Sequence, residues 1–284
     1  MRILSLKSYA KINIALSITE SREDGYHELD SVMIPVELHD TIILSKLRKA
    51  VDNYVTVDDY TLTAFNHNLA TYAIDKLSEL YKFEQKFRIF IHKNIPIQAG
   101  LGGGSSNAAF TMKAVNQMLK LGIDNDKLKS IGKTLGADVP FFIDCVPCRV
   151  TGIGENITPI TIKNNYYVLL VKPKQGCSTK ETYSKFQQKN HKNINIENVI
   201  KALEEGDDEL LANSIGNDLE DPAIESVPEI QVIKDYLKSK GLKIVMMSGS
   251  GSTVFAMSQD KKLLKTIEEE LEDKYFVELT KVLK

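Results

Sequence analysis

The chain has 284 residues with 43% hydrophobic side chains, and its 36 basic and 38 acidic side chains leave a formal net charge of -2. This length predicts one large or two moderate domains, and the apolar content suffices for a core, so a mainly disordered chain is not expected. The near-neutral charge argues against a nucleic-acid partner bound through general phosphate neutralisation. No apolar run approaches the roughly 20 residues that a bilayer span needs, so no membrane partner is expected either.

The first residues and the cysteines indicate a cytoplasmic protein. The segment from Met1 to Ala10 contains Arg2 and Lys7 but lacks the long apolar stretch and cleavage site of a signal peptide. Three cysteines are few for this length and odd in number, which fits a reducing compartment. The sequence leaves open whether the protein is a monomer or a homodimer.

The first third of the chain is predicted to be rich in strands. Clustered or alternating β-forming residues place them at 5–18, 30–37, 40–45, 54–57 and 87–92. One helix is expected among them, over residues 68–81, because its apolar side chains recur at helical spacing and Asn68 can cap its N-terminus. The strand at 87–92 leads directly into a glycine-rich loop, and residues 105–121 after the loop have the apolar face of a helix.

The rest of the chain mixes short helices and strands. Asp124 or Asp126 is expected to cap a helix that ends at Gly136. Strands are expected at 149–152, 166–171, 244–247, 253–257 and 275–279, helices at 199–203, 209–214, 229–238 and 261–271, and a polar loop at 185–195. Because strands and helices do not alternate strictly, the predicted class is α+β, with a soft boundary that divides the chain into domains 1–158 and 159–284.

The glycine-rich loop indicates a phosphate-binding site. Its residues are Pro96, Ile97, Gln98, Ala99, Gly100, Leu101, Gly102, Gly103, Gly104, Ser105 and Ser106. Glycines let the backbone approach an anion closely, and the following helix offers N–H groups that lack partners within the helix. The two serines add hydroxyls that suit a phosphate oxygen or a magnesium ion. A nucleotide phosphate chain is the expected ligand, and a glycine-rich turn without a ligand is the alternative.

The spacing of this loop excludes two common phosphate loops. A dinucleotide fingerprint that began at Gly100 would need a sixth-position glycine where Ser105 stands. A Walker loop needs lysine after its last glycine, but Ser105 follows Gly104. The loop therefore belongs to a less common type.

Two charged residues in apolar surroundings are candidates for catalysis. Lys11 lies inside an apolar strand, either as an edge residue whose charge reaches solvent or as a charge held for function. Asp138 enters an apolar segment, either as the N-cap of a helical turn at 139–143 or as the general base for a substrate hydroxyl with Lys11 as its cationic partner. Phosphoryl transfer depends mostly on positioning and charge stabilisation, so one such pair beside an ATP site would suffice.

Two further motifs each have two interpretations. Residues 24–27 are either a surface turn or a platform in which Tyr26 stacks on a base and His27 binds the edge of that base. Cys145 and Cys148 form a Cys-x-x-Cys motif, which we interpret as two ordinary thiols rather than as a redox pair or half a zinc site, because no second pair exists. The histidines have no zinc-binding spacing, and no metal site built by the protein is predicted.

Three separated motifs together resemble those of the GHMP kinases. They are residues 10–13 with 24–27, the loop at 96–107, and Ser248-Gly249-Ser250-Gly251 near the C-terminus. Residues 24–27 and 136–142 are most similar to the branch of that family whose substrate carries a cytidyl group. The resemblance implies a two-domain α+β fold, with an N-terminal kinase domain, a C-terminal domain of ferredoxin-like topology and a catalytic cleft between these domains.

The resemblance also implies a reaction, in which ATP, carrying Mg²⁺ with it, phosphorylates the 2-hydroxyl of 4-diphosphocytidyl-2-C-methyl-D-erythritol. It implies that Asp138 is the base and Lys11 its partner. It further places Asn13 near the methylerythritol, Tyr26 and His27 at the cytosine, and Asn68 and Lys93 near the adenine of ATP. Two alternatives stay open: another GHMP kinase, such as homoserine or mevalonate kinase, and an inactive nucleotide-binding or sugar-sensing protein.

Overall fold

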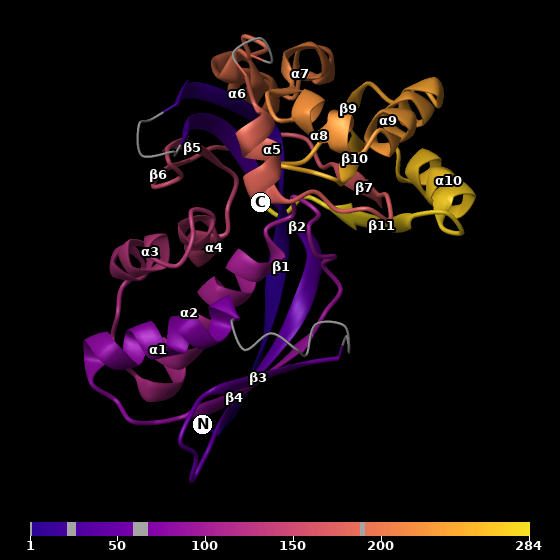
Figure 1. Cartoon of the computed structure of the whole chain (residues 1–284). Coiled ribbons are helices and arrows are strands. Elements are labelled where there is room, and N and C mark those ends of the chain that lie inside the picture. The colour runs from indigo at the N-terminus through magenta and orange to yellow at the C-terminus, as the bar shows by residue number, and fades with distance from the viewer. Residues whose placement is uncertain (1, 22–26, 59–67, 188–190) are drawn as a thin grey trace. The chain divides into compact units, whose positions relative to one another are not determined.

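The computed structural model describes residues 2–21, 27–58, 68–187 and 191–284. These residues form two compact units whose segments interleave along the chain. The first unit comprises Met1–Ala10, His39–Pro96 and Gly102–Cys145, and the second comprises Lys11–Leu38, Ile97–Leu101 and Val146–Lys284. The long strands β1 (Ile3–Ser21) and β2 (His27–Lys46) supply residues to both units (Figure 1). The division into domains 1–158 and 159–284 stays a prediction.

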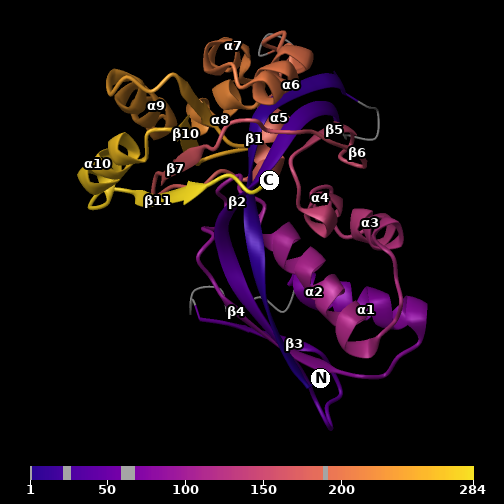
Figure 2. The ribbon, with the colours of Figure 1, turned by 180° about the vertical axis from the view of Figure 1, so that it is seen from behind.

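The first unit combines strands with four helices. β3 (Tyr54–Val57) pairs in parallel with β4 (Phe87–His92), and β4 pairs antiparallel with the last residues of β2. The helices are α1 (Leu69–Tyr81), α2 (Gly103–Leu119), α3 (Asn125–Lys133) and α4 (Val139–Asp144). α1 packs against α2, and α4 packs against both α2 and α3 (Figure 2). α2 packs against each of the other three helices and is therefore the central helix of this group.

Local capping explains where two of these helices begin. The Asn68 side chain accepts a hydrogen bond from the Ala70 N–H (2.8 Å), which confirms the predicted N-cap of α1. Asp124 accepts from the Lys127 N–H (2.8 Å) and is the cap of α3. In contrast, α2 begins at Gly103, two residues earlier than expected, and its N-cap Gly102 provides no side-chain hydrogen bond.

The second unit contains a four-stranded antiparallel sheet. Its strands are β7 (Tyr167–Lys172), β9 (Ile244–Met247), β10 (Val254–Ser258) and β11 (Phe276–Lys281), in the order β11-β7-β10-β9. This order, in which the first and last strands are neighbours, is the ferredoxin-like topology that was expected. Helices α9 (Glu229–Ser239) and α10 (Lys261–Leu271) pack on the sheet and share its apolar core (Figure 1).

Short elements complete the second unit. β5 (Cys148–Gly152) pairs antiparallel with β2 and with β6 (Asn156–Pro159), and β8 (Gly216–Asn217) pairs in parallel with β1. The remaining helices are α5 (Thr179–Lys185), α6 (Ile196–Glu205), α7 (Asp208–Ser214) and α8 (Glu220–Ser226). α5 and α8 were not predicted, since both are seven residues long and their sequences are largely polar.

The α+β class is confirmed, and two local predictions are wrong. The strands expected at 30–37 and 40–45 form the single strand β2, because the intervening residues stay extended and the alternation of buried and more exposed side chains runs through them without a turn. Lys185 was expected in a loop but is the last residue of α5. Among the described residues no helix is long and apolar enough to cross a membrane.

Within the described part of the chain, no three His, Cys, Asp or Glu side chains form a group that could hold a metal ion. The Cys-x-x-Cys motif is therefore not part of such a group there. Cys148 is buried in β5, and Cys145 is half-buried after α4. Burial raises the pKa of the Cys145 thiol to about 11, so this thiol stays protonated and unreactive near neutral pH.

Replacement of Leu77 tests the packing of α1. Leu77 is fully buried, so Leu77→Ala should lower the free energy of unfolding by about 2–5 kcal/mol through lost burial and the cavity left behind. Leu80 lies on the same helix but is 46% exposed, and Leu80→Ala should cost no more than about 0.5 kcal/mol. Urea unfolding of the two variants measures the difference. Equal losses would contradict the assignment of the buried face.

Candidate active site

Four consecutive carbonyl groups of the glycine loop, at residues 98–101, point into the protein. Each accepts a hydrogen bond from a distant segment of the second unit. The bonds are Cys177 N–H to Gln98 (3.1 Å), Thr253 N–H to Ala99 (3.3 Å), Ser248 Oγ to Gly100 (3.0 Å) and Lys11 N–H to Leu101 (3.1 Å). Carbonyl oxygens carry partial negative charge and would repel a phosphate. Their inward orientation therefore suits this loop to an anion.

The backbone of the loop is shaped by close approach to the Ser248–Gly251 turn. Gly100 has a φ of +72°, and a Cβ at this position would lie 2.0 Å from the Ser248 carbonyl oxygen. Only glycine fits there. Gln98 also has a positive φ, of 50°, which is unfavourable for a residue with a side chain. The loop conformation is thus imposed by its tertiary hydrogen bonds rather than by local preference alone.

The second half of the loop opens helix α2 in the first unit. The N-cap Gly102 gives no side-chain bond to the first turn, which therefore keeps the positive end of the helix dipole without a side-chain cap. Lys93 adds a cation here, because a Cβ on Gly103 would lie 3.3 Å from the Lys93 Nζ. Such a combination of a helix N-terminus and a lysine attracts phosphate.

The position of Lys93 is set by a buried carboxylate. Asp40 is fully buried, forms an ion pair with Lys93, and accepts hydrogen bonds from the N–H groups of Asn94 (2.9 Å) and Ile95 (2.8 Å). A buried carboxylate requires partners of this kind. Lys93 and Asn68 were both predicted to lie near adenine. Their roles in ATP binding stay predictions, and the Asn68 side chain also caps α1.

The two serines of the loop have different surroundings. The Ser106 hydroxyl is buried, donates to the Tyr9 carbonyl oxygen (2.6 Å) and lies 2.8 Å from the Ser8 hydroxyl, so it ties α2 to β1 within the first unit. Ser105 is half-buried, and its Oγ would lie 3.8 Å from a Cβ on Gly136. Of the two hydroxyls, that of Ser105 is the better placed to meet a ligand.

Asp138 follows Gly136 by two residues and so lies close to the first turn of α2. It occupies the N-cap position of α4, but its side chain makes no capping hydrogen bond. Pro140 in the first turn of α4 has no N–H that would need a cap. Capping therefore does not account for an aspartate at this position. The carboxyl group is half-buried, and its role as the base stays a prediction.

Lys11 is 3% exposed, which contradicts the alternative of an edge lysine whose charge reaches solvent. Its Nζ donates to the Asn13 Oδ1, and the Asn13 Nδ2 donates in turn to the Ser31 Oγ (2.9 Å). The Asn13 N–H donates to the Ser248 Oγ (3.2 Å), and a Cβ on Gly249 would lie 3.1 Å from the Lys11 Nζ. The first and third motifs thus meet at the glycine loop within the second unit, whereas Asp138 belongs to the first unit.

His27 lies in an aromatic cluster that the sequence did not indicate. Its ring stacks on that of Tyr183 with centroids 5.4 Å apart and an angle of 25°, and Phe186 meets it edge-on at 6.1 Å. Burial lowers the pKa of His27, so its imidazole is neutral near pH 7. Tyr26 lies outside the described residues. Two aromatic residues three positions apart, Tyr183 and Phe186, were the available signal for this cluster.

Two protein families match this chain. The model described as GHMP kinases N terminal domain matches residues 68–145, and the model described as GHMP kinases C terminal matches residues 199–277. The first match contains the whole glycine loop and Asp138. The second contains the Ser248–Gly251 turn.

Individual relatives agree with the family models. The 4-diphosphocytidyl-2-C-methyl-D-erythritol kinase of Thermodesulfovibrio yellowstonii is 36% identical over 264 residues, which cover 91% of each chain. That of Clostridium beijerinckii is 38% identical over 278 residues, covering 96% of this chain and 97% of the relative.

Solved structures share the fold. A crystal structure of 4-(cytidine 5'-diphospho)-2C-methyl-D-erythritol kinase, 28% identical, superposes with a TM-score of 0.83 and covers 99% of this chain and 100% of its own. A homoserine kinase from Cytophaga hutchinsonii has a TM-score of 0.71 and covers 99% of this chain and 96% of its own, but at 16% identity it shows the fold alone. The chain belongs to the GHMP kinases, in the branch of the 4-diphosphocytidyl-2-C-methyl-D-erythritol kinases.

Proposed function

We propose that this chain transfers the γ-phosphoryl group of ATP to the 2-hydroxyl of 4-diphosphocytidyl-2-C-methyl-D-erythritol, a step of non-mevalonate isoprenoid precursor synthesis in the cytoplasm. The observation that carries the kinase chemistry is the glycine loop, whose carbonyl groups at 98–101 are bonded away from the ligand side. The choice of substrate rests on relatives that bear this name and share 36–38% identity with most of the chain.

The phosphate groups of ATP would lie at the loop and at the first turn of α2. Backbone N–H groups and the helix dipole stabilise negative charge there, and charge stabilisation with positioning supplies most of the catalysis in phosphoryl transfer. Lys93, which Asp40 holds close to Gly103, would add a positive charge. Mg²⁺ would enter with ATP, bound mainly through phosphate oxygens and water, with the Ser105 hydroxyl as the protein group on offer.

Asp138 would accept the proton of the 2-hydroxyl as this oxygen attacks the γ-phosphorus. A new oxygen–phosphorus bond forms, the bond from the γ-phosphorus to the bridging β–γ oxygen breaks, and ADP leaves. Lys11 would supply the cation for this transfer, and Asn13 would orient the methylerythritol. The hydrogen bond from Lys11 to Asn13 supports a shared role for these two residues.

His27 and its aromatic neighbours would bind the cytosine. A neutral imidazole has one donor and one acceptor, so it can pair with a base edge that also offers both. The stack on Tyr183 fixes the ring plane of His27, which is the requirement for such a pair. Tyr26 would stack on the base, as the resemblance implies. The partner is a small molecule, and the protein would act as a monomer or a homodimer.

The substrate assignment is tested by phosphorylation assays with three alcohols. We expect turnover with 4-diphosphocytidyl-2-C-methyl-D-erythritol and none with homoserine or mevalonate, because only the first offers a cytosine to the His27 cluster. ADP release and ³¹P NMR of the product measure the reaction and the position of the new phosphate. Activity on homoserine or mevalonate alone would overturn the proposal in favour of another GHMP kinase. ATP binding without phosphorylation of any of them would favour an inactive binding protein.

Replacement of Asp138 tests the base. Asp138→Asn should lower kcat by about 100-fold or more, since general base catalysis typically contributes 10²–10⁴-fold, while the affinity for ATP changes little. Asp144→Asn at the other end of α4 is the control, because Asp144 only pairs with Lys129 and Asn125. Steady-state kinetics with both substrates measures the effect. Wild-type turnover in Asp138→Asn would refute the assignment.

The pH dependence of substrate binding tests His27. Because burial holds the pKa of His27 below its usual value of about 6.5, the ring stays neutral through pH 6.5–8 and becomes charged only at lower pH. The KM for the cytidyl substrate should therefore be constant over pH 6.5–8 and rise below this range. His27→Gln keeps a donor and an acceptor but does not titrate, so its KM should lose this rise. A rise that persists in His27→Gln would assign the titration to another group.

A further inference from the structure

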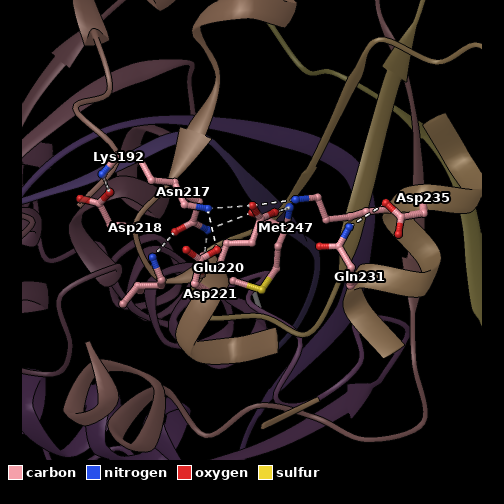
Figure 3. A network of polar contacts seen from close by, with 11 residues as sticks. Lys192, Asn217, Asp218, Glu220, Asp221, Gln231, Asp235 and Met247 are labelled. Atoms are coloured by element: carbon pink, nitrogen blue, oxygen red, sulfur yellow. Dashed lines mark hydrogen bonds and ion pairs between the residues drawn. The ribbon is translucent and has the colours of Figure 1, made fainter. Parts of the chain in front are cut away.

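Three polar residues of the second unit are buried in one short stretch, where β8 leads into α8. Asn217 and Asp218 are fully buried and Glu220 is 5% exposed. Burial of an amide and two carboxylates is costly unless each is hydrogen-bonded or paired. The side chains of Asn217, Asp218 and Glu220 each have several partners, and these lie in different segments (Figure 3). We call these three residues with their partners the buried polar network.

Asn217 is bonded entirely to backbone. Its Nδ2 donates to the carbonyl oxygens of Met247 (2.9 Å) and Gly249 (2.8 Å), and its Oδ1 accepts from the Leu219 N–H (2.9 Å). Because the Asn217 amide donates to both Met247 and Gly249, it fixes the course of the chain between these two residues. That stretch is the end of β9 and the start of the Ser248–Gly251 turn.

Glu220 fixes the same stretch through the N–H group of Met247, whereas Asn217 binds the carbonyl group of this residue. Its carboxylate accepts from the Met247 N–H (3.1 Å) and is paired with Lys234 (2.7 Å) and Lys192 (3.1 Å). The attraction of these two lysines lowers the pKa of Glu220 despite its burial, so the acceptor stays ionised at neutral pH. Asp218 binds elsewhere, to the N–H groups of Ile18 and Lys192 (2.8 Å each), and is not part of this contact.

The turn that Asn217 and Glu220 hold is the one that shapes the glycine loop. Ser248 donates to the Gly100 carbonyl oxygen (3.0 Å), and the Gly249 Cα lies so close that a Cβ would be 3.0 Å from that oxygen. The same Cβ would be 3.1 Å from the Lys11 Nζ. A displacement of the turn therefore moves Gly100 and Lys11 together.

We propose that Asn217 and Glu220 are positioning residues of this kinase, which set the phosphate loop through the Ser248–Gly251 turn and so determine the affinity for ATP. The inference rests on the proposed function. Both side chains are buried: the polar atoms of Asn217 are bonded to backbone, and the Glu220 carboxylate is bonded to the Met247 N–H and to two lysines, so each acts through the turn. Loss of the Asn217 amide leaves two buried carbonyl groups without their donor, and the turn relaxes away from Gly100.

The test is the binding of MgATP to the full chain, measured by calorimetry without the alcohol substrate. Asn217→Ala should raise the Kd for MgATP by about 10- to 100-fold, the scale of effect that a small misplacement of binding groups produces. The KM for the cytidyl substrate should change less than the Kd for MgATP, because Asn217 binds Met247 and Gly249, whereas α5, which carries Tyr183, contacts the turn only through Ser250 among the described residues. Leu264→Ala is the control, since Leu264 is fully buried in the core of the same unit but lies in α10. It should destabilise the fold and leave the Kd for MgATP unchanged.

A second variant keeps the proposal testable if Asn217→Ala does not fold. Ser248→Ala removes the bond from Ser248 to the Gly100 carbonyl oxygen, together with the acceptor of the Asn13 N–H, and should also raise the Kd for MgATP. If both single variants fold, their effects should be less than additive in the double variant, because both act through one turn. Wild-type affinity in folded Asn217→Ala or Ser248→Ala overturns the inference, as does an equal loss in Leu264→Ala. Failure of the wild type to bind MgATP would instead overturn the proposed function.

Discussion

The inward orientation of four successive carbonyl groups at residues 98–101 is the constraint on which the rest of the site depends. A loop can bind phosphate only if its oxygens point elsewhere, and here each oxygen is satisfied by a donor from another segment of the second unit. Glycine at position 100 is what allows the approach of the Ser248 carbonyl group. The phosphate site therefore needs the ferredoxin-like part of the second unit to be folded around it.

This dependence explains why polar residues are buried near the loop, although apolar side chains there would avoid the free-energy cost of desolvation. Lys11, Asn13 and Asn217 are each at most 3% exposed, and hydrogen bonds compensate their desolvation. Lys11 bonds the Asn13 side chain, the Asn13 N–H bonds the Ser248 hydroxyl, and Asn217 bonds the Gly249 carbonyl group. Such bonds have preferred distances and directions, whereas apolar contacts tolerate sliding. Their burial contributes position more than stability, and position is what phosphoryl transfer requires.

The predicted site residues belong to both units. The first unit contains the N-terminus of α2, Lys93 held by Asp40, and Asp138 at the start of α4. The second contains the first half of the glycine loop, Lys11 and the aromatic cluster at His27. Lys93 and His27 are each held by a contact inside their own unit.

Structural features that depend on neighbours a few residues away could be predicted from the sequence alone. The caps at Asn68 and Asp124, the apolar face of α1 and the α+β class all follow from local spacing and capping. The resemblance to a kinase family could be seen for the same reason, because its motifs are short and contiguous. Asp138 and Lys11 were singled out in this way as polar residues in apolar segments, and their catalytic roles stay predictions.

The contacts between residues far apart in the sequence could be seen only in the tertiary structure. The Ser248 hydroxyl bonds a residue 148 positions away, and Asn217 bonds Gly249 of the turn, 32 positions away. No periodicity or motif in one sequence encodes such pairs, and the same holds for the stack of Tyr183 on His27. Helices α5 and α8 were missed because their short, polar sequences have weak helical periodicity, and packing in the folded unit stabilises them. Local patterns specify the elements, whereas the contacts that position the phosphate loop exist only once those elements pack.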